Sequence, residues 1–143
     1  MKLSQIFFAF LMGYFIYSLI EIVGRGYTHW TMALTGGTVL ALLYVINSRR
    51  TMTLIKSCFI GSVLITGLEL CVGIFDNIIM GWNVWDYTDM PLNVLGQICL
   101  PFSGLWFLLC IPAYYLCRAI RIQFGLHRKN DESHNMHGAQ DLL

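Results

Sequence analysis

Four long runs of apolar residues, separated by short polar stretches, follow one another along the chain. In a helix, about 20 consecutive apolar residues are enough to cross a bilayer. The pattern therefore predicts an all-α integral membrane bundle of four transmembrane helices, over residues of about 5–23, 31–47, 54–79 and 94–117. The third run is longer than a bilayer requires, so we expect that helix to tilt or protrude. The fourth contains Pro101 and Pro112, which neighbouring helices in a bundle tolerate.

These runs define a transmembrane domain over residues 1–126, and the composition agrees with it. The chain is 57% hydrophobic and 12% charged, whereas a soluble domain is about 45–50% apolar and about 25% charged. A soluble globule and a disordered chain are both excluded. Residues 127–143 are instead polar and include three histidines. For this tail we expect a disordered cytoplasmic segment rather than a metal site.

Lysine and arginine are distributed unevenly between the connections. They occur between the second and third runs and after the fourth: Arg49, Arg50, Lys56, Arg118, Arg121, Arg128 and Lys129. The connection between the third and fourth runs has Asp86 and Asp89 but no basic residue. Because basic residues favour the cytoplasmic side, we expect a multi-pass protein of the bacterial plasma membrane with both termini cytoplasmic. The aromatic segment 81–87 would then lie in the outer headgroup layer.

Sequence motifs of enzymes are absent. There is no P-loop, no H-E-x-x-H and no G-x-S-x-G. The five cysteines are scattered without a C-x-x-C pair, which argues against a disulfide framework and a zinc site. We therefore expect no enzyme activity, no metal, no cofactor and no nucleic-acid partner, and a bilayer as the surroundings of the chain.

Ionisable residues inside the runs are the main candidates for function, because they are costly at membrane depth. Glu69 lies on a small and polar stripe that we expect to face other helices: Cys58, Ser62, Thr66, Glu69, Gly73 and Asp76. A carboxylate at this depth is either protonated or paired. In the first run, Glu21 and Arg25 have the spacing of a helical ion pair. In the second, Ala33, Gly37 and Ala41 form a small-residue ridge that lets another helix approach closely.

With the predicted topology, eight polar residues share the outer half of the protein. They are Glu21, Arg25, His29, Glu69, Asp76, Asp86, Asn93 and Gln97. One hypothesis is an outward-facing polar pocket that binds a ligand or an ion, with Asp86 and Asn93 holding the outer loop onto the bundle. The alternative is a network of interhelical hydrogen bonds that only holds the bundle together. The sequence leaves both open.

Several segments resemble a known family. They are Gly13–Glu21, Leu68–Leu70, Trp85–Tyr87 and Pro91–Leu100. Together they resemble the bacterial family described as putative ABC-transporter type IV, or CmpB-like, over about residues 1–121. The most specific part is the W-D-Y element and the P-x-N-x-x-G-x-I-C stretch that follows it. The family's proline- and cysteine-containing element after the first span is not kept, because residues 27–37 here contain neither residue.

The resemblance implies a permease-like membrane subunit, with a separate ATPase subunit or a homo-oligomer as its partner. Glu69 would be the proton- or cation-responsive group, while Arg25 would pair with a carboxylate or meet an anionic ligand. A second hypothesis is a non-transporting accessory subunit, whose partner would pack on the Ala33–Gly37–Ala41 ridge. A third is a membrane enzyme acting on lipid or cell-wall precursors.

Overall fold

The computed structural model describes the backbone of residues 2–140 and the side chains of residues 2–125. The helices are α1 (Leu3–Arg25), α2 (Trp30–Asn47), α3 (Leu54–Gly73), the π-helical segment η1 (Ile74–Ile79) that continues α3, and α4 (Leu100–Gln140). Within this part of the chain no strand occurs beyond one isolated bridge between Val94 and Ile98. Four helices are long and apolar enough to cross a membrane. The predicted all-α fold is confirmed.

The fourth helix differs from the prediction at both ends. It begins at Leu100 rather than near residue 94, because Leu95 and Gly96 have positive φ angles of 57° and 67° that an α-helix cannot contain. Pro101 therefore falls in the first turn, where its missing N–H has no helical acceptor to lose. The helix also continues to Gln140, where a disordered tail was predicted from residue 127. No proline follows Pro112 to end it. Residues 141–143 of the predicted tail lie outside the described residues.

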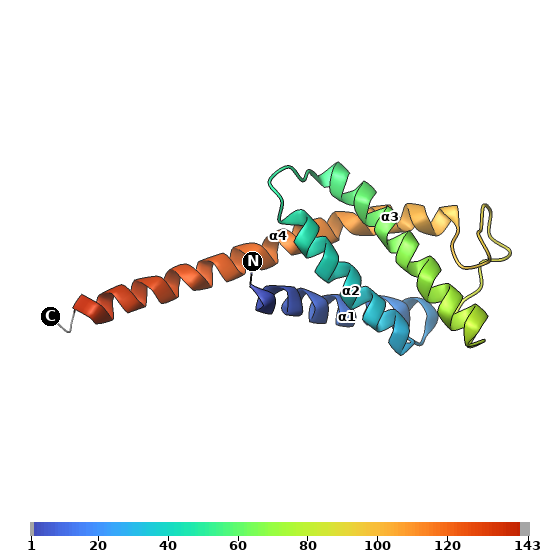
Figure 1. Ribbon diagram of the computed structural model, residues 1–143, viewed down its shortest axis with the longest axis horizontal. Helices are drawn as coiled ribbons and strands as arrows, with labels where there is room; N and C mark the ends of the chain where they lie inside the picture. The colour runs from blue at the N-terminus through green and yellow to red at the C-terminus, as the bar shows by residue number, and fades with distance from the viewer. Residues whose placement is uncertain (1, 141–143) are drawn as a thin grey trace.

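Two helical hairpins make up the bundle. α1 packs along α2, and α3 packs along α4, while α2 also contacts α3 and α4. In contrast, α1 makes few contacts with α4. Figure 1 shows the N-terminus and the α2–α3 connection at one end of the bundle. The α1–α2 connection and the loop between η1 and α4 lie at the other, which we call the loop end.

Glycines allow α1 and α2 to approach closely. A Cβ atom added to Gly13 would lie 2.5 Å from the backbone oxygen of Gly36, and one added to Gly37 would lie 2.8 Å from Cε2 of Phe10. Ala33 is only 2% exposed. Ala33 and Gly37 of the small-residue ridge are thus buried within this chain, with α1 against Gly37, whereas Ala41 is half-buried. Two of the three ridge residues are therefore not available to another protein, in contrast to what the accessory-subunit hypothesis required.

The polar stripe of α3 faces its neighbours, as predicted. Ser62 Oγ donates a hydrogen bond of 2.8 Å to the backbone oxygen of Ser103 on α4, and Thr66 Oγ1 lies 3.0 Å from Ser103 Oγ. Four other members of the stripe are buried: Cys58, Glu69, Gly73 and Asp76. The small-residue ridge packs α2 against α1, and the polar stripe joins α3 to α4. The stripe extends along α3 to the loop end of the bundle.

Candidate ligand-binding site

The carboxyl group of Glu69 lies between α3, α4 and the loop that precedes α4. Only 3% of this residue is exposed. Trp106 Nε1 donates to Oε2 over 2.9 Å, and Tyr87 Oη donates to Oε1 over 3.1 Å. Both donors are neutral, and no Lys, Arg or His in the described part of the chain forms an ion pair with Glu69. The carboxyl group is therefore hydrogen-bonded, but its charge is not balanced.

Tyr87 reaches Glu69 because the loop of residues 80–99 folds back onto the bundle. Trp85 Nε1 donates to the backbone oxygen of Gln97 over 2.9 Å, and the Tyr87 ring stacks on Phe102 with centroids 4.6 Å apart. Burial, followed by the nearby Glu69, raises the pKa of Tyr87 above its ordinary value. The phenol thus keeps its proton and remains a donor. Trp85 is only 7% exposed, so its ring and that of Tyr87 pack against the protein, and the placement of segment 81–87 in the headgroup layer stays a prediction.

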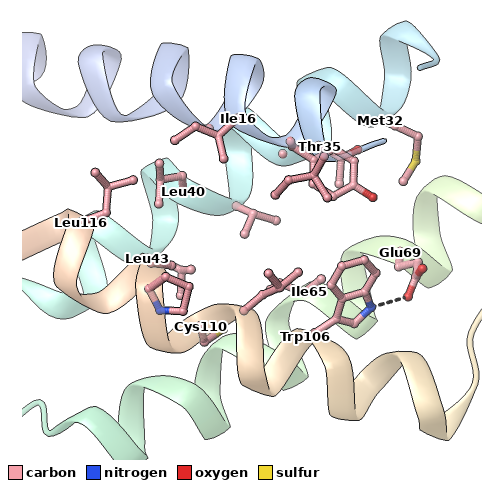
Figure 2. A pocket seen from close by; sticks show the side chains of 18 residues that line it. Ile16, Met32, Thr35, Leu40, Leu43, Ile65, Glu69, Trp106, Cys110 and Leu116 are labelled. Atoms are coloured by element: carbon pink, nitrogen blue, oxygen red, sulfur yellow. Dashed lines mark hydrogen bonds between the residues drawn. The ribbon is translucent and has the colours of Figure 1, made fainter. Parts of the chain in front are cut away.

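A cavity of about 300 Å³ lies between the four helices. Figure 2 shows Glu69 and Trp106 at one end of it and Leu116 at the other. Between them the walls are mainly aliphatic and come from all four helices, including Ile16 of α1, Leu40 of α2 and Ile65 of α3. The shape provides an apolar chamber with one carboxyl group at its end.

Arg25 connects α1 to the loop end. Its Nη1 lies 3.3 Å from Glu21 Oε1, so the predicted ion pair is present. The contact is not an aligned hydrogen bond, because Oε1 has no hydrogen-bond partner among the described residues. Glu21 Oε2 accepts a hydrogen bond of 3.0 Å from Thr28, and Arg25 Nη2 donates to the backbone oxygen of Val84. Arg25 is therefore occupied by α1 and by the loop, and it does not line the cavity.

Asp76 occupies a separate position in η1 and is 0% exposed. Thr31 Oγ1 donates to its Oδ2 over 2.5 Å. His29 Nδ1 lies 2.6 Å from the same Thr31 oxygen and 3.9 Å from Asp76 Oδ2. Because the single hydroxyl proton goes to Asp76, His29 must be the donor to Thr31. This His–Thr–Asp chain joins α2 to η1 and borders a second cavity of about 370 Å³, whose walls are mainly apolar.

The remaining predicted residues shape the loop itself. Gln97 Oε1 accepts a hydrogen bond of 2.7 Å from Asn77. Asn93 Nδ2 donates to two loop carbonyls, while its Oδ1 accepts from the backbone N–H of Gly96. Asp86 is exposed, and the backbone N–H of Thr88, which donates to it over 2.9 Å, lowers the pKa of Asp86. The hydrogen bonds of Asp86 and Asn93 are therefore made within the loop itself. They do not join the loop to the helices, in contrast to the prediction.

Comparison with known proteins identifies the family. The profile of the family described as "Putative ABC-transporter type IV" matches residues 12–135. The chain belongs to this family. Neither the curated proteins nor the solved structures contain a match to the chain. It is thus a multi-pass membrane protein related by its family to ABC transporters.

In this ABC-transporter-related protein, the eight predicted residues do not form one pocket. Glu21 pairs with Arg25, Asp76 with His29, and Glu69 alone of the eight lines the cavity between the four helices. Within the described residues, no three His, Cys, Asp or Glu side chains are grouped as a metal site would need. Trp106 and Tyr87, the two donors to Glu69, were not among the residues predicted for the site. The W-D-Y element contained a signal for Tyr87, whereas nothing in the periodicity of the fourth run distinguished Trp106.

Proposed function

We propose that this chain is a permease-like membrane subunit of a transporter, and that the cavity between its four helices binds the solute. The observation that carries the proposal is the buried carboxyl group of Glu69 at the end of an otherwise apolar chamber. Ligand pockets are typically about 300–1,000 Å³, mainly apolar, with a few polar groups that orient the ligand. The cavity meets this description at its lower limit of size.

The proposed arrangement places the loop end outside a bacterial plasma membrane and both termini in the cytoplasm. The basic residues Arg49 and Arg50, between α2 and α3, support this orientation. Four helices enclose too little space for a solute path of their own, so the mechanism includes a separate ATPase subunit, with or without further copies of the chain. Figure 1 shows the C-terminal part of α4 extending beyond the bundle, on the side where an ATPase would lie.

The test is to purify the tagged full-length chain from its native membrane in mild detergent and to identify its partners by mass spectrometry. A stoichiometric ATP-hydrolysing subunit is the expected result. A variant that ends at Gly125 serves as the comparison, because it removes the projecting part of α4 and should lose the ATPase. Recovery of the full-length chain alone, or only as a homo-oligomer without an ATPase, would contradict the permease proposal.

A further inference from the structure

We infer that the cavity takes an amphiphilic organic cation, namely an amine with a compact apolar body. The inference rests on the proposed function, since it assigns the chemistry of the same cavity. Three features of the cavity lead to it: the uncompensated carboxyl group, the aromatic rings beside that group, and the absence of a second charged side chain from the walls.

The carboxyl group of Glu69 is the first feature. Each of its oxygens accepts one hydrogen bond from a neutral donor, Trp106 or Tyr87. A carboxylate oxygen has a second lone pair, so each can accept another bond. An ionised carboxylate in such surroundings is costly without a cation. A ligand ammonium group would supply both the missing charge and the donors.

Aromatic rings flank the same end of the cavity. Tyr17 of α1 and Trp106 of α4 both line it, with ring centroids 6.4 Å apart. Trp106 also donates to Glu69, so the two rings and the carboxyl group belong to one end of the chamber. The faces of such rings attract cations, most strongly in the case of tryptophan. Two rings, one from α1 and one from α4, and one carboxyl group form a suitable environment for an ammonium group.

The walls exclude other classes of ligand. None of the lining residues is Lys, Arg, His or Asp, and Glu69 is the only acidic one. At the loop end, Arg25 is held by Glu21 and by the backbone of Val84. An anion would therefore face Glu69 with no group to balance it. A sugar would leave most of its hydroxyl groups unpaired, because the walls between Glu69 and Leu116 are mainly aliphatic.

The test uses three probes that share one apolar body and differ only in their polar head: 1-aminoadamantane, 1-adamantanol and adamantane-1-carboxylate. Binding to the full-length protein in lipid nanodiscs is measured by calorimetry, with empty nanodiscs as the blank for partitioning into lipid. We expect the amine to bind at least about ten-fold more tightly than the alcohol, and the carboxylate more weakly than both.

Two variants complete the experiment. Glu69→Gln should reduce the affinity of the amine to that of the alcohol without changing the affinity of the alcohol. Asp86→Asn, which removes an exposed carboxyl group outside the cavity, should change none of the three affinities. If Glu69→Gln does not fold, Leu43→Trp, which places a larger side chain in the wall of the cavity, should abolish binding of all three probes.

The possible results separate the inference from the function on which it rests. Equal affinities for the three probes, or an amine affinity unchanged in Glu69→Gln, would overturn the inference and leave an apolar solute site in place. Tight binding of the carboxylate would overturn it as well. If no probe binds while the ATPase co-purifies, the inference fails and the permease subunit stands.

Discussion

The close contact between α1 and α2 gives a prediction whose size can be worked out. In Gly36→Ala, the added Cβ would lie 2.4 Å from Tyr17 Cβ and 2.7 Å from Tyr17 Cγ. Carbon atoms prefer separations of about 3.5–4.0 Å, so α1 has to move by about 1 Å. Cβ is fixed to the backbone of α1, and a rotamer change cannot relieve the contact. Overpacking of this kind costs about 1–3 kcal/mol, and the better helix propensity of alanine returns up to about 1 kcal/mol.

We therefore expect Gly36→Ala to lower the free energy of unfolding by up to about 2 kcal/mol when the full helix-propensity gain is realised, and by about 1–3 kcal/mol relative to a glycine-to-alanine change without the contact. The matched control is Gly67→Ala, since nothing lies within 4 Å of the added atom. This control should be as stable as the wild type or more stable by up to about 1 kcal/mol. Both variants are measured by reversible denaturation in mixed micelles. If Gly36→Ala is as stable as Gly67→Ala, the deduced contact between α1 and α2 is incorrect.

Three further predictions concern the stripe and the loop end. Ser62→Ala should lower the stability by about 0.6–2 kcal/mol, because it removes the hydrogen bond to α4. Ser57→Ala should leave the stability unchanged or raise it by up to about 1 kcal/mol, because that buried hydroxyl has no hydrogen-bond partner among the described side chains. Equal effects of the two substitutions in denaturation would contradict this. Because the pKa of Tyr87 is raised in the folded protein, the stabilisation that its protonated hydroxyl gives to the fold is complete below the ordinary pKa of 10.0. This stabilisation is lost as the pH rises above that value. Tyr87→Phe should therefore lower the free energy of unfolding at neutral pH and reduce the loss of stability at alkaline pH. An unchanged dependence of stability on alkaline pH would contradict this prediction. Asn93→Ala should increase hydrogen exchange in the loop of residues 80–99, since it removes three hydrogen bonds that the loop makes with itself; unaltered exchange would refute that role.

Local features of the sequence were sufficient for much of the fold. The α3 stripe and the Glu21–Arg25 pair follow from the spacing of residues within one helix, which the helical period sets. Similarly, the four apolar runs marked the four helices, because length and composition alone decide whether a helix can span a bilayer.

Contacts between distant segments could not be predicted in this way. Trp106 meets Glu69 across 37 positions because the rotation of α4 brings them together, and no period within either helix contains that rotation. The course of the loop of residues 80–99 could not be predicted either, since Leu92 and Leu95 adopt positive φ angles that leucine rarely takes. The cavity lies between helices that include α1 and α4, which make few contacts with each other, and this is a property of the whole bundle.

The segments that carry the family resemblance lie together in space although they are separate in the chain. Glu69, Tyr87 of the W-D-Y element and Gln97 of the following stretch are connected through hydrogen bonds and through the fold of one loop. The first resembling segment contributes Tyr17 to the same cavity. The part of the sequence typical of the family is therefore the part that surrounds the buried carboxyl group.

The separation of Glu69 from its donors has a consequence for biosynthesis. Tyr87 and Trp106 come 18 and 37 residues later in the chain, so the third span reaches the membrane before either donor does. Insertion of an acidic residue at that moment costs on the order of 3 kcal/mol, with no native hydrogen bond to offset it. The span extends over 26 residues from Leu54 to Ile79, more than a bilayer needs. Its extra leucine, isoleucine, valine and phenylalanine residues supply the free energy that carries the carboxyl group into the lipid ahead of its donors.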